Sequence, residues 1–377
     1  MLPIYFINEL CDKLLENLEH SEIIPGCIIA SPSKNDPDYF YHWARDSALT
    51  CSTILKILNW SYLDPNHKLR FEKVLHNYIL FEKHFIKCNY NLGEPKYHVD
   101  GRLFTEPWGR PQNDGPALKI LLSVNLYKYF YSNKMLLEKL YNKDISKPSI
   151  IKSNLEYLCN NYNQPSFDLW EEVLGFHFYT SYNQYLALLK GSKLALELED
   201  IHAYKYYLEI AEKIKNEILT KFFINNKFYS NLDKDFNPIR EYDSANILLL
   251  TQNNREDIEE LLTNNLLISN IDNGIIKYKE YYLLNKDLET PWIGRYFNDT
   301  YYEGKPWILL TASLGQFYKL FNDDLKNHNK IIEIKNKLKN YWIIFKNFAE
   351  QVDTNDLKPI SADHLTWSYC EVLRLFL

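Results

Sequence analysis

Six clusters of tryptophan, arginine and acidic residues recur along the chain at nearly regular intervals, and no other sequence feature restricts the fold as strongly. The clusters are centred on Trp43, Trp108, Trp170, Arg240, Arg295 and Glu350. The successive gaps are 65, 62, 70, 55 and 55 residues. Each gap fits two helices of roughly four or five turns with their connections. Each cluster also lies just before, or at the start of, a predicted helix.

The stretches between the clusters follow a helical period. Apolar residues recur at helical spacing over 4–19, 44–60, 66–87, 114–133, 172–196, 200–222, 241–250, 255–267, 305–322, 331–347 and 361–377. Strand-like alternation is confined to short pieces, such as 227–232 and 274–284. A chain that repeats helix-out, helix-back six times returns every cluster to the same end. The sequence therefore predicts an all-α fold, an (α/α)6 barrel with a site at one mouth, although any all-helical protein has loops at similar intervals.

The composition is that of a globular protein without nucleic-acid or membrane partners. Hydrophobic residues make up 46% of the 377 residues, which is ample for a core. Length alone suggests two domains, but no Ser-, Pro- or Gly-rich linker divides the chain, so we expect a single domain over 1–377. The formal charge of −6 and the lack of a basic stripe disfavour nucleic acid. No run of about 18 apolar residues predicts a membrane span.

The cysteines and the N-terminal residues bear on cellular location. The six cysteines lie far apart without a C-x-x-C pair, so zinc-ligand spacing is absent. Their placement suits buried, unpaired thiols at least as well as disulfides. The first residues lack the basic region and the long apolar region of a signal peptide. We therefore expect a cytoplasmic protein, or a secreted one if a leader has been removed.

The segment Asp-Leu-Trp-Glu-Glu at 168–172 places two adjacent carboxylates beside Trp170. At the start of a helix, neighbouring side chains point about 100° apart, so Glu171 and Glu172 cannot share one role. A carboxyl group that faces an aromatic-lined cavity stays protonated near neutrality and can donate a proton. The alternative is an acidic first helical turn with Trp170 in the core.

A second candidate carboxylate is Glu350, in Phe-Ala-Glu-Gln-Val-Asp at 348–353. It follows the amphipathic stretch 331–347 and precedes a polar loop that ends at Ser361. This serine can cap the last helix or donate a hydrogen bond that keeps a nearby carboxylate ionised. Taken alone, a glutamate in a loop is usually exposed to solvent. As a partner for Glu171, Glu350 becomes a candidate general base.

Three loops combine aromatic residues with arginine and aspartate, which is the mixture that sugar sites need. Aromatic faces stack on a pyranose ring, while arginine and aspartate bind its hydroxyl groups. The residues are Tyr39, Trp43, Arg45 and Asp46 in the first loop, Trp108, Arg110 and Asp114 in the second, and Arg295, Asp299, Tyr301 and Trp307 in the third. Each Arg–Asp pair could instead be a structural salt bridge that holds its loop.

Taken together, these segments resemble the signature blocks of the glucoamylase family, glycoside hydrolase family 15. The matching blocks are SPSKNDPDYFYHWARDS, LGEPKYHVD, WGRPQNDGPAL, FDLWEEV, GRYFNDTYYEGKPW, AEQVD and SADHLTWSY. They follow the family's order from about residue 28 to residue 376, so nearly the whole chain is covered. Phe104, Val352 and Asn298 depart from the family pattern, in positions that affect outer binding more than the reaction.

The resemblance implies an (α/α)6 barrel with a pocket-shaped active site. It implies an exo-acting enzyme that releases β-D-glucose from α-1,4 and, more slowly, α-1,6 glucans and malto-oligosaccharides with inversion. By match to the family, Glu171 is the general acid and Glu350 the general base. The substrate-binding and supporting residues implied are Tyr39, Trp43, Arg45, Asp46, Trp108, Arg110, Asp168, Trp170, Glu172, Arg295, Asp299, Tyr301, Trp307, Ser361 and Trp367.

The resemblance implies neither a metal nor a cofactor, and the partner it implies is the α-glucan substrate. We expect a monomer that has no starch-binding domain. Two alternatives stay open. One is a related α-glucosidase of shifted linkage, acting on isomaltose, dextran or trehalose. The other is a catalytically silent glucan-binding regulatory domain, which the presence of both glutamates disfavours.

Overall fold

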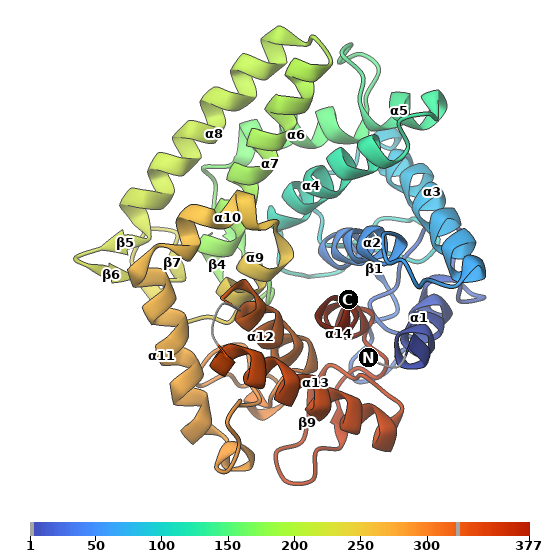
Figure 1. The fold of residues 1–377 in the computed structure, drawn as a ribbon. Helices are drawn as coiled ribbons and strands as arrows, with labels where there is room; N and C mark the ends of the chain where they lie inside the picture. The colour runs from blue at the N-terminus through green and yellow to red at the C-terminus, as the bar shows by residue number, and fades with distance from the viewer. Residues whose placement is uncertain (1–3, 322–324) are drawn as a thin grey trace.

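The computed structural model describes residues 4–321 and 325–377 and consists of two concentric rings of helices (Figure 1). The inner ring is formed by α2 (Ala44–Leu58), α4 (Asp114–Tyr129), α7 (Phe178–Glu197), α9 (Ala245–Gln252), α12 (Ile308–Leu320) and α14 (Thr366–Phe376). Successive inner helices pack against each other in this order, and α14 closes the ring against α2. The predicted (α/α)6 barrel is therefore confirmed.

The outer ring covers the inner one. Its main helices are α1 (Ile4–Leu18), α3 (Pro65–Lys87), α6 (Ile150–Asn161), α8 (Ile201–Lys221), α11 (Asn265–Tyr281) and α13 (Leu325–Phe345). Two short helices lie between an inner helix and the outer helix that follows it: α5 (Lys134–Leu140) between α4 and α6, and α10 (Arg255–Leu262) between α9 and α11. No helix within 4–321 and 325–377 has the length and apolar character to cross a bilayer.

Burial distinguishes the two rings. Every residue of α14 is buried, because this helix is enclosed on all sides. The outer helix α8 buries only a stripe, which includes Tyr207, Ile210, Ile214 and Ile218 at helical spacing. The inner helices therefore supply the centre of the core, and the outer helices seal it with one face each.

The order of the rings determines where the loops lie. Each outer helix leads into the next inner helix, so six connections, at 19–43, 88–113, 162–177, 222–244, 282–307 and 346–365, meet at one end of the barrel. The six sequence clusters fall in these connections or on the first turn of the following inner helix. The barrel therefore gathers them, as the spacing predicts.

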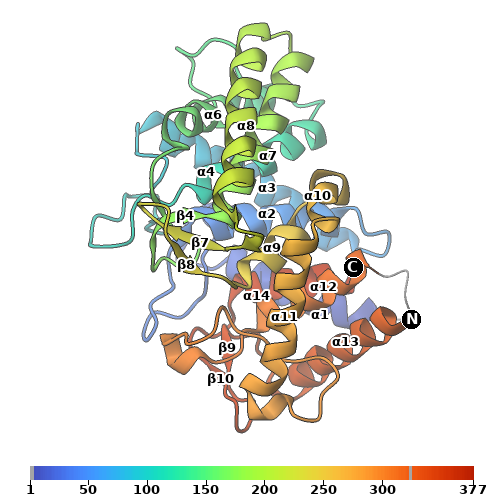
Figure 2. The same ribbon diagram turned by 90° about the vertical axis from the view of Figure 1, so that its left-hand side faces the viewer.

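Short antiparallel strands join neighbouring connections (Figure 2). A four-stranded sheet, in the order β3 (Ser166–Phe167), β4 (Leu174–His177), β7 (Asn231–Asp233) and β8 (Pro238–Arg240), joins the third connection to the fourth. The first and second are joined by β1 (His42–Trp43) and β2 (Lys96–Tyr97). Two further pairs are β5 (Phe223–Ile224) with β6 (Lys227–Phe228), and β9 (Gln351–Val352) with β10 (Pro359–Ile360). These pairs fix the loops that carry the site.

Two sequence predictions of local structure are wrong. The helix expected over 172–196 begins only at Phe178, because 174–177 form strand β4. A side chain at Gly175 would lie 2.1 Å from the carbonyl oxygen of Leu232, and this close approach of two strands explains the glycine. The strand-like piece at 274–284 lies largely in helix α11, where Ile271, Ile275 and Tyr278 are buried at helical spacing.

Candidate active site

A cavity of about 600 Å³ opens where the connections meet, and five of the six connections line it. Its volume falls within the usual range of ligand sites, roughly 300–1,000 Å³. The predicted site residues that line it are Tyr39, Trp43, Arg45, Asp46, Trp108, Trp170, Glu171, Glu172, Arg295, Tyr301, Trp307, Glu350 and Trp367. We call it the active-site cavity.

Glu171 lies in the tight turn between β3 and β4 rather than on a helix. Its backbone has φ 67°, which is uncommon for a residue with a side chain. Oδ1 of Asp168 holds the turn by accepting hydrogen bonds from the backbone N–H groups of Glu172 (2.8 Å) and Val173 (3.0 Å). The turn therefore directs Glu171 and its neighbour Glu172 away from the helix that follows.

Two indole groups and a guanidinium group orient the Glu171 carboxylate. Trp43 Nε1 donates to its Oε1 at 2.8 Å, and Trp108 Nε1 donates to its Oε2 at 2.8 Å. Arg45 Nη2 lies 3.3 Å from Oε1, while Arg45 Nη1 binds Asp114 at 2.8 Å. Both carboxylate oxygens are therefore held by donors from the first and second connections.

Glu350 is nearly inaccessible to solvent, with 2% of its surface exposed. Its backbone N–H donates to the carbonyl oxygen of Ala362 at 2.9 Å, and the Ser361 hydroxyl donates to its Oε2. Burial raises the pKa of Glu350 to about 7, against the opposing effect of hydrogen bonds from Ser361, Tyr39 and Tyr301. The hydroxyl groups of Tyr39 and Tyr301 lie 2.8 Å apart. A set of hydroxyl groups thus surrounds this carboxyl group.

Burial also shifts the pKa of Asp46, which pairs with Arg45 at the start of α2. Arg45 Nε lies 3.7 Å from Asp46 Oδ1, and both side chains are largely buried. Burial raises the pKa of Asp46 to about 7, although the charge of Arg45 acts in the opposite direction. The two residues line the cavity side by side, where they can bind the hydroxyl groups of a ligand.

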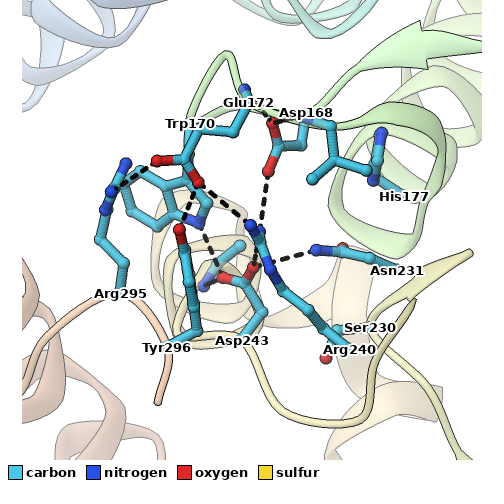
Figure 3. Close-up of polar contacts among 12 residues, drawn as sticks. Asp168, Trp170, Glu172, His177, Ser230, Asn231, Arg240, Asp243, Arg295 and Tyr296 are labelled. Atoms are coloured by element: carbon cyan, nitrogen blue, oxygen red, sulfur yellow. Dashed lines mark hydrogen bonds and ion pairs between the residues drawn. The ribbon is translucent and has the colours of Figure 1, made fainter. Parts of the chain in front are cut away.

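Two arginines hold Glu172 and the acidic turn in place (Figure 3). Arg295 Nη2 binds Glu172 Oε1 at 2.7 Å, and Arg240 Nη2 binds Glu172 Oε2 at 3.0 Å. Arg240 Nη1 also binds Asp168 at 2.9 Å and Asp243 at 3.3 Å. Because Asp168 holds the turn that carries Glu171, Arg240 links the fourth connection to that turn.

The same network fixes Trp170 and Arg295. Trp170 Nε1 donates to Asp243 Oδ1 at 2.9 Å, which anchors the indole through a residue outside the cavity lining. Asp299 binds Arg295 through two hydrogen bonds, of 2.7 Å to Nε and 2.6 Å to Nη2. Planar two-point pairing of this kind holds an arginine in one orientation.

Four predicted residues lie behind the cavity wall. Asp168 binds the backbone of Glu172, Asp299 binds Arg295 and Ser361 binds Glu350, so each contacts a residue that lines the cavity. Arg110 does not line the cavity, and its guanidinium group binds Glu94 at 2.6 Å and the carbonyl oxygens of Phe104 (2.7 Å) and Glu106 (2.9 Å), so its contact with substrate stays a prediction. Arg110 holds its loop, which is the structural alternative for such arginines.

Lys96 is a cavity residue that the sequence analysis missed. Its Nζ lies 3.3 Å from the ring centroid of Trp108 and 4.2 Å from that of Phe104, with Tyr41 and Trp43 also within 5 Å. Burial lowers the pKa of Lys96 to about 8. Its place in the block LGEPKYHVD was the available signal, but a lysine beside aromatic residues is usually exposed.

Tyr296 and Asp243 were also missed as supporting residues. Tyr296 donates to Glu172 through its hydroxyl group, and Asp243 binds Trp170 and Arg240. In the sequence, both residues lie next to the clusters around Arg295 and Arg240, and this proximity was the available signal.

Within the described residues, no group of three or more His, Cys, Asp or Glu side chains is arranged to hold a metal ion.

Comparisons with known proteins agree with this geometry. The model of glycosyl hydrolases family 15 matches residues 12–333. A glucoamylase of Saccharomycopsis fibuligera is 32% identical over 84% of this chain and 68% of its own length. An intracellular sporulation-specific glucoamylase of Saccharomyces cerevisiae is 29% identical over 90% of this chain and 68% of its own length.

The fold is shared with solved structures. The S. fibuligera glucoamylase structure superposes with a TM-score of 0.81 at 24% identity, covering 98% of this chain and 94% of that one. The structure of a family 15 glucoamylase from Hypocrea jecorina gives a TM-score of 0.80 at 25% identity, covering 99% of this chain and 70% of that one. Both rings of helices are therefore common to these proteins.

Proposed function

Because the chain belongs to glycosyl hydrolases family 15, we propose that it is a glucoamylase, an inverting glucan 1,4-α-glucosidase. It releases β-D-glucose from the non-reducing ends of α-1,4 glucans and malto-oligosaccharides, and cleaves α-1,6 bonds more slowly. One observation carries this proposal. Among the carboxyl groups that line the active-site cavity, Glu171 and Glu350 come from separate connections and lie among aromatic and arginine side chains.

The two glutamates have complementary tasks. Glu171 donates its proton to the glycosidic oxygen as the bond to the anomeric carbon breaks, and the leaving chain departs with a new hydroxyl group. Glu350 removes a proton from the water whose oxygen attacks that carbon from the opposite face. An inverting mechanism needs the two carboxyl groups roughly 6.5–9.5 Å apart so that this water fits. The hydroxyl groups around Glu350 support its ionised form.

The residues that line the cavity account for the binding of the terminal glucose of a glucan. Arg45, Asp46 and Arg295 bind the hydroxyl groups of the terminal glucose, and the aromatic rings of Trp43 and Trp108 pack against the sugar faces. We further propose that the chain works as one monomeric catalytic domain on dissolved oligosaccharides, dextrin or glycogen. The last helix, α14, packs against the first two helices, α1 and α2, which supports a single domain.

A time course of glucose release from maltotriose, with the anomer followed by proton NMR, tests the proposal. We expect β-glucose to appear ahead of mutarotation, with maltose as the second product. α-Glucose as the first product would contradict inversion. Faster release from isomaltotriose or trehalose would favour the enzyme of shifted linkage. No release from any of the three sugars would indicate a binding domain.

A further inference from the structure

A second cavity, of about 560 Å³, lies between helix α11 and the connections that carry Arg240 and Tyr296. We call it the α11 cavity. It is nearly as large as the active-site cavity and falls in the size range of ligand sites. Apart from Arg240 and Tyr296, its lining residues have no part in the reaction proposed above. Its wall has an aromatic part and a polar part.

The aromatic part includes Tyr242 and Phe297, half-buried rings whose centroids lie 5.3 Å apart. Tyr242 packs directly on α11, because a side chain at Gly274 would come within 1.9 Å of its ring. A glycine inside a helix costs about 1 kcal/mol relative to alanine. Gly274 therefore lets an aromatic ring lie against the helix and form a flat part of the cavity wall.

The polar part is one face of α11. Ser269, Asn270, Asn273 and Lys277 line the cavity at helical spacing. Asn270 Nδ2 donates to the carbonyl oxygen of Glu241 at 3.1 Å, which orients the amide. Its Oδ1 is buried, and no donor within 4–321 or 325–377 reaches it. Ser269, Asn273 and Lys277 are exposed on this face, so their polar groups can bind the hydroxyl groups of a ligand.

The charges in the wall are of both signs, since Lys227, Arg240 and Lys277 are basic and Glu241 is acidic. Arg240 is paired with Asp168, Asp243 and Glu172. Lys277 Nζ lies 4.0 Å from the ring centroid of Phe297. Rings that pack against the C–H face of a pyranose, together with amide groups that bind hydroxyl groups, are the chemistry of a sugar site. We propose that the α11 cavity is a second binding site for α-glucan.

The site rests on the proposed function, which supplies the ligand class. The walls of the two cavities contact each other, because Arg240 and Tyr296 of one bind Glu172 of the other. The guanidinium carbon of Arg240 lies 3.6 Å from the ring centroid of Tyr296, and both side chains bind Glu172. A glucan in the α11 cavity therefore contacts the residues that orient Glu172 in the active-site cavity. A polymeric substrate held there stays beside the site of hydrolysis.

Calorimetric titration of maltoheptaose into the Glu171→Gln variant, which binds without turnover, tests the second site. We expect two bound molecules per chain. Adding Asn273→Trp should reduce this to one, because the indole fills the α11 cavity. Adding Ile276→Trp should leave two, because Ile276 lies on the same helix, is 60% exposed and does not line the cavity.

One molecule per chain in Glu171→Gln, or two retained with Asn273→Trp, would overturn the proposal. Ser269→Trp blocks the same cavity from another position and serves if Asn273→Trp does not fold, as judged by far-UV circular dichroism. Glucose release from maltotriose by the unsubstituted chain is a separate readout. Its absence, with two molecules of maltoheptaose bound, would contradict the proposed catalysis and leave the second site standing.

Discussion

Glu171 and Glu350 differ in how the protein holds them, and this difference decides what a neutral replacement does. Glu171 accepts hydrogen bonds from two indole N–H groups, whereas Glu350 is buried among hydroxyl groups. We expect Glu171→Gln and Glu350→Gln each to lower kcat by at least about a hundredfold, the scale of general acid–base catalysis. The thermal unfolding midpoint should change little, since glutamine keeps the shape. Retained turnover in either variant, measured on maltotriose, would contradict that residue's role.

Ser361 controls the proton affinity of Glu350. A general base must be ionised, so activity falls as the pH drops through the pKa of Glu350, which burial raises. The Ser361 hydroxyl stabilises the ionised form and lowers this pKa. Ser361→Ala should therefore move the acidic limb of the kcat/KM profile to higher pH. Ser52→Ala, on α2 outside the active-site cavity, is the control. An unmoved limb in Ser361→Ala would contradict the assignment of Glu350 as the base.

At the scale of elements, the four-stranded sheet and the ion pairs of Arg240 join the third connection, 162–177, to the fourth, 222–244. Arg240→Met would leave the buried carboxylate of Asp168, 1% exposed, without its cation. Loss of one partner from a buried pair costs about 3–5 kcal/mol of the free energy of unfolding. Turnover should fall too, because Asp168 holds the turn that carries Glu171.

The control for Arg240→Met is Arg102→Met. Arg102 pairs with Asp100 at 2.7 Å, but its side chain is 75% exposed, so its loss should cost no more than about 1 kcal/mol. Urea unfolding of both variants measures the difference. Equal losses of unfolding free energy in the two variants would mean that the ion pairs of Arg240 stabilise the protein no more than the exposed pair of Arg102 does.

At the scale of the whole molecule, closure of the inner ring depends on its last helix. α14 packs between α12 and α2, and Leu373 within it is fully buried. Leu373→Ala should lower the free energy of unfolding by about 2–5 kcal/mol through a cavity that the ring cannot collapse. Leu219→Ala, at a 52% exposed position on α8, should stay within about 0.5 kcal/mol. Similar urea midpoints would show that α14 does not close the ring.

The sequence by itself determined the class of fold and the end of the molecule at which the site lies. Helical periodicity is local, so it can be read without knowing distant contacts. The regular spacing of the clusters then predicted a repeated hairpin, which brings Glu171 and Glu350 to one end. The six cysteines, for which the sequence left disulfides and free thiols open, are unpaired in the structure and, except for Cys88, buried.

The tertiary structure alone decided which charged groups face the ligand. Arg110 and Arg295 lie in loops of similar composition, yet Arg295 lines the active-site cavity and Arg110 binds Glu94 and two carbonyl oxygens. The partner of an arginine depends on which carboxylate the folded chain brings within about 3 Å, and sequence distance does not contain that information. For the same reason, Lys96 and Arg240 could be assigned to the site only after the connections had been placed side by side.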